Sequence, residues 1–387
     1  MPMSSLNKLK PGLAGLGLLG FLLAAAAPDA QAIDIKAREA ILIEADSGTV
    51  LLEKDSDVPV PPASMSKIMT VYKAFTHIKD GRLSMDDMLP VSEKAWRMGG
   101  SKMFVEVDTQ VRVEDLLRGI IVQSGNDACI VIAEALSGSE EAFAQELTEM
   151  GDAMGLQESS FANSTGWPHP NHLMSARDLA TLARRMIFDF PELYKIFSET
   201  EFTYSDIRQG NRNPLLYKSL GADGLKTGYT AEAGYGLTAS AKRGDLRVIL
   251  VIGGLTSAKA RAEEAERLIG WAFREFKNYK LFEAGETVED AAVWQGTRES
   301  VPLVIPEAVK ATMSRAARKD LTVKVRYNEP IEAPVQEGQE LGSLIVETGQ
   351  GQTQSYPLLA GGSVERLGRI ARLWSSVKYM IFESGLE

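Results

Sequence analysis

Strand-forming segments stand on both sides of a long helical stretch in this 387-residue chain. The first two are separated by an Asp-Ser-Gly turn, which favours a β-hairpin. Because helices bury their apolar faces against a neighbouring layer, this order predicts one antiparallel sheet with helices packed on it, an α+β fold. We expect the first and last strands of that sheet to meet. The predicted strands are 40–43, 49–52, 223–229, 236–241 and 246–252.

Apolar residues recur at helical spacing from residue 64 to about residue 197, with Gly and Pro clusters between the segments. A further helix, from 258 to about 276, follows the last strand and completes a first domain at 33–282. Ser175 followed by Asp178 is typical of a helix N-terminal cap, so we interpret this pair as structural. The clearest helices of the middle stretch are 113–122, 127–136, 142–154 and 176–187.

Residues 283–362 alternate short β-rich runs with Gly and Pro turns, which predicts a small all-β domain. The run 321–325, Leu-Thr-Val-Lys-Val, is an example. No repeat or low-complexity tract interrupts either domain.

The N-terminal segment 1–32 has the features of a signal peptide. Lys8 and Lys10 precede an apolar run over 13–27, and Ala30-Gln31-Ala32 offers small residues for cleavage. The apolar run is short for a bilayer span, so an uncleaved anchor is the alternative interpretation. The sequence therefore predicts an exported protein.

Charge and cysteine content narrow the possible partners. The formal net charge is -10, which argues against nucleic acid because phosphate binding needs a basic surface. The single cysteine, Cys129, has no partner within the chain for a disulfide. Its apolar neighbours favour a buried, inert thiol.

Three short motifs carry the chemistry. Ser64 and Lys67 lie three residues apart at the start of a predicted helix, which brings their side chains onto one face. The spacing alone is weak evidence, since Ser5 with Lys8 and Ser375 with Lys378 repeat it. Ser64 differs because two other motifs follow it in order, Ser124-Gly125-Asn126 and Lys226-Thr227-Gly228.

With these motifs the chain resembles the low-molecular-mass penicillin-binding proteins of the D-Ala-D-Ala carboxypeptidase type. Segments 100–104 (Gly-Ser-Lys-Met-Phe), 123–128 (Gln-Ser-Gly-Asn-Asp-Ala) and 224–228 (Gly-Leu-Lys-Thr-Gly) carry the resemblance. It implies a β-lactamase/transpeptidase-like sheet with helices, followed by the all-β domain and an amphipathic tail. It also implies peptidoglycan stem peptides and β-lactam antibiotics as partners, with no cofactor and no metal.

The residues themselves also suggest a mechanism. A serine hydroxyl needs an adjacent base, and none of the three histidines falls in the motif set. Lys67 can serve as that base if burial and a nearby Lys226 ammonium lower its pKa. Ser124 could then relay the proton to the leaving group.

The resemblance implies roles for the remaining motif residues. Asn126 would hold the substrate amide, and Lys226 with Thr227 would bind the terminal carboxylate, beside Gly228. The backbone amides of Ser64 and Tyr229 would form the oxyanion hole. Some relatives carry histidine where this chain has Tyr229, and we assign Tyr229 no proton transfer.

Three alternatives remain open. A β-lactamase needs a glutamate and a water to release its penicilloyl ester, and we cannot place such a glutamate in the loop 158–172. A D,D-endopeptidase uses the same nucleophile and differs in what the cleft admits. A non-catalytic peptidoglycan-binding protein would be expected to have lost part of the motif set.

The C-terminal segment 363–387 is predicted to be an amphipathic helix that lies in the membrane surface. Between residues 365 and 378 it carries four basic residues and one acid, and such charges contribute about 1 kcal/mol each near anionic lipid. The alternative is that its apolar face docks on the all-β domain. The apolar face comprises Leu367, Ile370, Ala371, Trp374, Val377 and Ile381.

Overall fold

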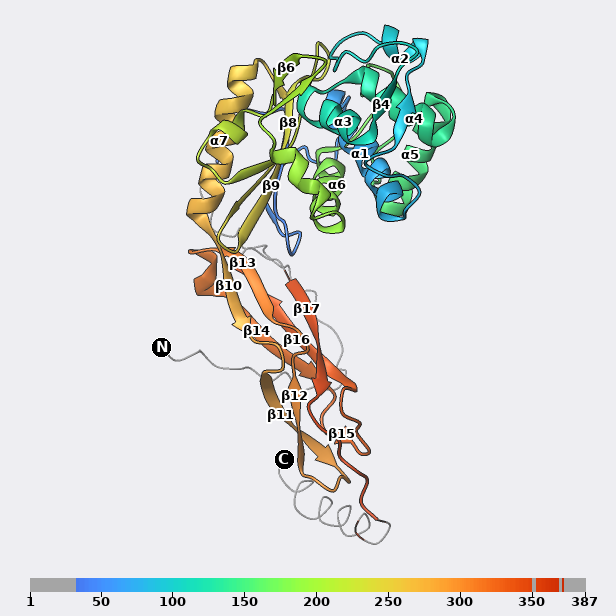
Figure 1. Ribbon diagram of the computed structural model, residues 1–387. Helices are drawn as coiled ribbons and strands as arrows, with labels where there is room; N and C mark the ends of the chain where they lie inside the picture. Colours follow the sequence, from blue (N-terminus) through green and yellow to red (C-terminus); the bar gives the residue numbers. More distant parts are fainter. Residues whose placement is uncertain (1–32, 350–352, 369–370, 372–387) are drawn as a thin grey trace. The chain divides into compact units, whose positions relative to one another are not determined.

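The computed structural model describes residues 33–349, 353–368 and 371 (Figure 1). The predicted signal peptide and most of the predicted amphipathic tail lie outside these residues. The chain divides into two compact units between Glu275 and Phe276, whereas the sequence placed the division after residue 282. Helix α7 (Ala258–Glu275) runs directly into strand β10 (Phe276–Phe282), so no turn residues mark the change.

The first unit contains the predicted antiparallel sheet, with strand order β2-β1-β9-β8-β7. The first and last predicted strands meet, because Ala40 pairs with Ile252 and Leu42 with Leu250. This pairing confirms the expectation that the first and last strands meet within one antiparallel sheet. The strands are β1 (Glu39–Glu44), β2 (Val50–Lys54), β7 (Ala222–Thr230), β8 (Gly234–Arg243) and β9 (Leu246–Leu255).

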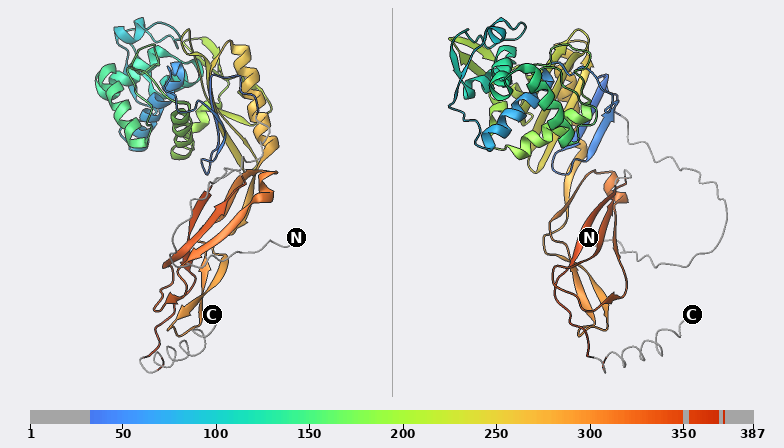
Figure 2. Two further views of the ribbon diagram at one scale, coloured as in Figure 1. Left: turned by 180° about the vertical axis from the view of Figure 1, so that it is seen from behind. Right: turned by 90° about the vertical axis from the view of Figure 1, so that its right-hand side faces the viewer.

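Helices cover both faces of this sheet. Helix α7 lies on one face, and the helices of the middle stretch lie on the other (Figures 1 and 2). Ile41 and Ile43 join the core beneath the helical middle, whereas the alternating Leu42 is buried on the α7 side. The helices of the middle stretch are α1 (Lys67–Lys79), α2 (Glu93–Arg97), α3 (Val113–Arg118), α4 (Asn126–Ser137), α5 (Glu140–Met154) and α6 (Ala176–Asp189).

The predicted helix 113–122 differs in one respect, because after α3 it continues as a π-helix, η2 (Gly119–Gln123). Ser124 ends that segment in the left-handed conformation, with φ 62°. Short elements complete the unit: the 3-10 turns η1 (Ala63–Ser66), η3 (Leu193–Ser198) and η4 (Pro214–Tyr217), and the strand pairs β3 (Met88–Pro90) with β4 (Gln110–Arg112) and β5 (Glu201–Tyr204) with β6 (Ile207–Gly210).

Two local predictions are confirmed. Ser175 caps α6, since its Oγ accepts a hydrogen bond from Asp178 N at 3.0 Å. Cys129 is fully buried in α4, and burial raises the pKa of its thiol to about 12. The thiol is therefore neutral and serves in packing.

The second unit is built from strands, as predicted. Its larger sheet has the order β14-β16-β17-β12-β11-β15, and β10 pairs separately with β13. No helix in the described ranges is long and apolar enough to cross a membrane. Besides β10 and the short turn η5 (Ala317–Asp320), the unit contains β11 (Thr287–Trp294), β12 (Ser300–Val304), β13 (Val309–Ser314), β14 (Thr322–Tyr327), β15 (Ile331–Glu332), β16 (Glu340–Glu347) and β17 (Thr353–Ala360).

Candidate active site

Ser64 and Lys67 lie in contact at the start of the α1 segment. Ser64 belongs to η1, directly after Ala63, whose φ of 49° is unusual for a residue with a side chain. Lys67 begins α1, and its Nζ lies 3.0 Å from Ser64 Oγ. The 3-10 turn followed by the first helical turn therefore brings a hydroxyl and an amine together.

Lys67 is completely buried, which changes its proton affinity. The pKa of Lys67 is lowered to about 8, chiefly by burial and also by the Arg212 guanidinium, while the Asp127 carboxylate acts in the opposite direction. At pH 7 about a tenth of the Lys67 side chains are then neutral, compared with about one in 3,000 at the ordinary pKa. A second contact, from Lys67 Nζ to the Thr165 carbonyl oxygen, holds the amine in place.

The second motif is anchored by its neighbour Asp127. The buried Asp127 carboxylate accepts hydrogen bonds from three successive backbone amides, those of residues 103–105, at 2.9 to 3.2 Å. Asn126 is tied to the same loop, since its Nδ2 donates to the Gly99 carbonyl at 2.8 Å. Its backbone N donates to Ser101 O at 2.7 Å. These bonds fix the loop 99–105 against the start of α4.

The third motif lies on β7, beside the Ser64 turn. Gly228 is required there, because a Cβ at this position would lie 2.9 Å from the Pro62 carbonyl and 3.2 Å from Ala63 Cβ. Lys226 is buried, and its Nζ donates to Thr227 O at 3.2 Å. Burial, followed by the charges of Lys67 and Arg212, holds the pKa of Lys226 well below its ordinary value.

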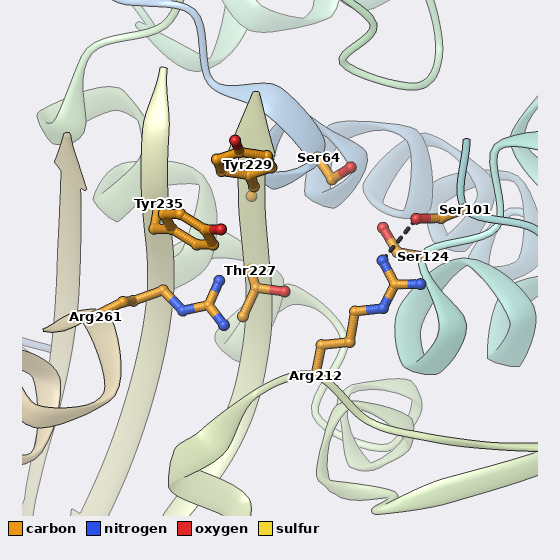
Figure 3. A pocket seen from close by; sticks show the side chains of 9 residues that line it. Ser64, Ser101, Ser124, Arg212, Thr227, Tyr229, Tyr235 and Arg261 are labelled. Atoms are coloured by element: carbon orange, nitrogen blue, oxygen red, sulfur yellow. Dashed lines mark hydrogen bonds between the residues drawn. The ribbon is translucent and has the colours of Figure 1, made fainter. Parts of the chain in front are cut away.

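A pocket of about 280 Å³ opens between the sheet and the helical middle (Figure 3). Its walls carry serine, threonine and tyrosine hydroxyls and two guanidinium groups, and none of its lining residues is acidic. Such a lining suits an anionic ligand. The lining residues are Ser64, Ser101, Ser124, Arg212, Thr227, Gly228, Tyr229, Tyr235 and Arg261.

The structure brings most of the predicted site residues to this pocket. The Ser124 Oγ is buried there and has no hydrogen-bond partner within the described part of the chain. Lys67, Asn126 and Lys226 lie behind the lining rather than in it. The described ranges contain no cluster of side chains suited to hold a metal ion.

Two arginines of the lining were not predicted as site residues. Arg212 reaches across the pocket to Ser101, with Nη1 2.6 Å from Ser101 Oγ (Figure 3). Arg261 is 9% exposed, and its buried Nε has no partner among the described residues. Its guanidinium lies 5.8 Å from the centre of the Tyr235 ring, which packs against the Tyr229 ring at a tilt of 31° with 4.2 Å between ring centres.

A signal for Arg261 was present in the sequence. The buried positions of α7 recur at helical spacing through Ala265, Leu268, Ile269 and Ala272, and Arg261 falls in phase with them. A charged residue on a buried helical stripe indicates a special environment. Arg212 has no comparable signal, since it lies in an irregular loop after β6.

Comparison with known proteins agrees with this geometry. Residues 24–256 match the family described as D-alanyl-D-alanine carboxypeptidase, and residues 276–366 match the C-terminal domain of penicillin-binding protein 5. The chain is 37% identical over 387 residues to the D-alanyl-D-alanine carboxypeptidase DacC of Escherichia coli, with 97% of each protein covered.

Solved structures give the same result. Penicillin-binding protein 5 from Haemophilus influenzae superposes with a TM-score of 0.78 at 35% identity, covering 86% of this chain and 98% of that protein. Penicillin-binding protein D2 from Listeria monocytogenes, solved in its ampicillin-bound form, superposes with a TM-score of 0.57 at 27% identity, covering 62% and 98%. The chain therefore belongs to the D-alanyl-D-alanine carboxypeptidase family of serine-type hydrolases.

Proposed function

We propose that this pocket removes the terminal D-alanine from peptidoglycan pentapeptides through an acyl-enzyme on Ser64. The observation that carries the proposal is the 3.0 Å contact between Ser64 Oγ and the buried Lys67 Nζ, at the edge of a pocket lined by cations and hydroxyls. A lysine with a pKa near 8 is poised to accept a proton close to neutral pH. Family membership supplies the chemical class of the reaction.

The contact between Ser64 and Lys67 and the roles implied by the family resemblance support the following sequence of steps. Neutral Lys67 takes the proton of Ser64 Oγ, which bonds to the carbonyl carbon of the penultimate D-alanine. The backbone amides of Ser64 and Tyr229 stabilise the resulting oxyanion. Collapse expels the terminal D-alanine, whose nitrogen receives a proton from Lys67 through Ser124. Water then hydrolyses the ester and restores Ser64.

The terminal carboxylate is bound by Arg261 and Thr227, with the Lys226 amine close by. Thr227 and Arg261 both line the pocket, whereas Lys226 lies behind it. Within the described part of the chain no carboxylate pairs with Arg261, and an almost buried guanidinium gains by pairing with one. Asn126, tethered beside Ser101, holds the amide on the other side of the scissile bond.

The function is tested with two pentapeptides that differ only in a free or an amidated C-terminus. We expect rapid D-alanine release from the free acid and slow cleavage of the amide. Arg261→Gln should lower kcat/KM for the free acid about 10- to 100-fold, as expected for a lost charge-assisted hydrogen bond. It should change kcat/KM for the amide little.

The matched control for that prediction is Arg274→Gln, an exposed arginine on the same helix, which should act like the parent on both peptides. Equal losses of kcat/KM on the free acid and the amide after Arg261→Gln would contradict carboxylate binding by Arg261.

Cross-linked muropeptides, incubated with the protein and analysed by mass spectrometry in parallel, distinguish carboxypeptidase from endopeptidase action. Cleavage of the cross-link in preference to the pentapeptide would favour the endopeptidase.

A β-lactamase role is not supported by the pocket. None of the lining residues carries a carboxylate that could activate water against a penicilloyl ester. The nearby Asp127 carboxylate already accepts several backbone amides. We therefore expect β-lactams to acylate the protein and the resulting ester to be hydrolysed slowly.

We also propose that the protein is exported and held at the membrane surface by its C-terminal segment 363–387. The basic and apolar residues of that segment support the proposal. Anchoring would keep the enzyme beside newly made wall peptides and raise their effective concentration.

A mature chain ending at Gly362 is expected to lose binding to anionic liposomes while it still cleaves pentapeptide. The mature chain beginning at Ile33 and ending at Glu387 should co-sediment with anionic liposomes and less with neutral ones, because its basic residues attract anionic lipid. Equal co-sedimentation of the two chains would contradict the anchor and favour docking of the segment on the all-β domain.

A further inference from the structure

A single side chain organises the loop that faces Lys67. Asn163 lies between α5 and α6, and its Oδ1 accepts hydrogen bonds from Thr165 N (3.1 Å), Gly166 N (2.8 Å) and Trp167 N (3.1 Å). The Thr165 hydroxyl donates to the same oxygen at 3.0 Å. Asn163 Nδ2 completes the turn by donating to Trp167 O at 2.9 Å. Such side-chain turns are typical of asparagine.

The turn is also held from outside. Thr70 of α1 donates its hydroxyl to Ser164 O at 2.7 Å, and Glu140 of α5 accepts from Ser164 Oγ at 2.8 Å. Gly166 has φ +77°, and a Cβ there would lie 1.9 Å from the carbonyl oxygen of Ala63. The turn is thus pressed against the residue that precedes Ser64.

This arrangement fixes the position of the Thr165 carbonyl group. Thr165 O accepts a hydrogen bond from Lys67 Nζ, whose other contact is Ser64 Oγ. A neutral amine has two N–H bonds and one lone pair, and the lone pair must face Ser64 Oγ to take its proton. Thr165 O is a fixed acceptor for one N–H bond of Lys67 Nζ. Because it lies on a different side of the nitrogen from Ser64 Oγ, it favours the orientation in which the lone pair faces that oxygen.

We propose that Asn163 is a positioning residue, which sets the Thr165 carbonyl and through it aims the Lys67 lone pair at Ser64. This inference rests on the proposed roles of Ser64 and Lys67. Asn163 is not among the residues that line the pocket, and both polar atoms of its side chain are hydrogen-bonded within its own turn. Without Oδ1, the backbone amides of Thr165 and Gly166 lose their acceptor, whereas Trp167 N keeps a hydrogen bond to Thr165 Oγ1 at 3.1 Å. The turn then rearranges, because unpaired amides are unfavourable.

The experiment is single-turnover acylation of the mature protein by a fluorescent penicillin. Asn163→Ala is expected to lower the acylation rate constant about 10²-fold, the effect of misplacing a reacting group by about 1 Å. The Kd of the initial complex should stay close to the parental value. Asn163→Asp keeps an oxygen acceptor and should recover most of the rate on the alkaline plateau.

The matched control is Asn171→Ala, an exposed asparagine of the same loop, which should be acylated at the parental rate.

The pH dependence of acylation is a second measurement, and a purely structural role of Asn163 would leave it unchanged. Asn163→Ala should shift the acid limb to higher pH, because a loosened turn admits water to Lys67 and raises its pKa. Asn163→Ser, whose hydroxyl is a weaker acceptor, should have an acylation rate constant between those of the parent and Asn163→Ala. This variant replaces Asn163→Ala in the experiment if the alanine variant folds poorly.

Two results would overturn the inference. The first is parental acylation by Asn163→Ala. The second is a loss shared equally by the rate constant and Kd, with an unmoved pH limb and no recovery in Asn163→Asp. Failure of the proposed function looks different, since the parent protein itself would then show no adduct on Ser64.

Discussion

Replacing Ser64 with alanine is expected to abolish both D-alanine release and covalent labelling by penicillin. Loss of the nucleophile removes the acyl-enzyme altogether, so kcat should fall by a factor on the order of 10⁶, the scale found in serine hydrolases. The fold should survive, because Ser64 contributes one hydroxyl to the pocket wall. Release is measured with pentapeptide, and labelling by mass spectrometry of the penicillin-treated parent.

Ser375→Ala provides the matched control, since Ser375 and Lys378 have the same spacing as Ser64 and Lys67. That variant should release D-alanine and bind penicillin like the parent. The adduct should be found on the peptide that contains Ser64. An adduct on another residue would contradict the assignment, and Cys129 is a poor rival because its thiol is buried and neutral.

The second large effect concerns Lys67 and pH. Lys67 acts in its neutral form, so protonation at lower pH inactivates it, and acylation should rise through pH 8 to a plateau. This window follows from burial, which lowers the pKa of Lys67 to about 8. Lys67→Ala should reduce acylation about 10²- to 10⁴-fold, the usual contribution of a general base. The rise near pH 8 should disappear with it.

Lys79→Ala is the control, because Lys79 lies on the same helix and is exposed. It should keep both the parental rate and the parental pH profile. Stopped-flow labelling with fluorescent penicillin between pH 6 and 10 gives both quantities. A Lys67→Ala protein that retains the rise near pH 8 would require a different base.

Residue patterns predicted the main elements of the first unit because its central strands are apolar runs and its helices are clearly amphipathic. The continuous apolar run through Ile41, Leu42 and Ile43 is buried on both sheet faces, and α6 and α7 keep one apolar stripe each. The division between units was harder to predict. It falls where α7 passes directly into β10, and the usual Gly and Pro signals are absent there.

The motifs likewise indicated which residues lie near Ser64. They did not indicate which of these residues line the pocket and which are buried next to it. Lys226 and Thr227 are adjacent on β7, and strand alternation sends their side chains to opposite faces. Only Thr227 therefore reaches the pocket wall. Arg212 enters the pocket from a loop, and a loop carries no periodicity from which its direction could be predicted.

The pairing of β1 with β9 has a consequence for the order of events during biogenesis. Strand β1 is made early, yet one of its two edges stays open until β9, at residues 246–255, has been synthesised. An unpaired apolar strand edge promotes aggregation, and contacts between distant residues slow folding. A growing chain that has not reached residue 255 cannot complete its sheet. Such a chain remains a substrate for chaperones and proteases, and the wall enzyme becomes folded only after nearly all of its first unit has emerged.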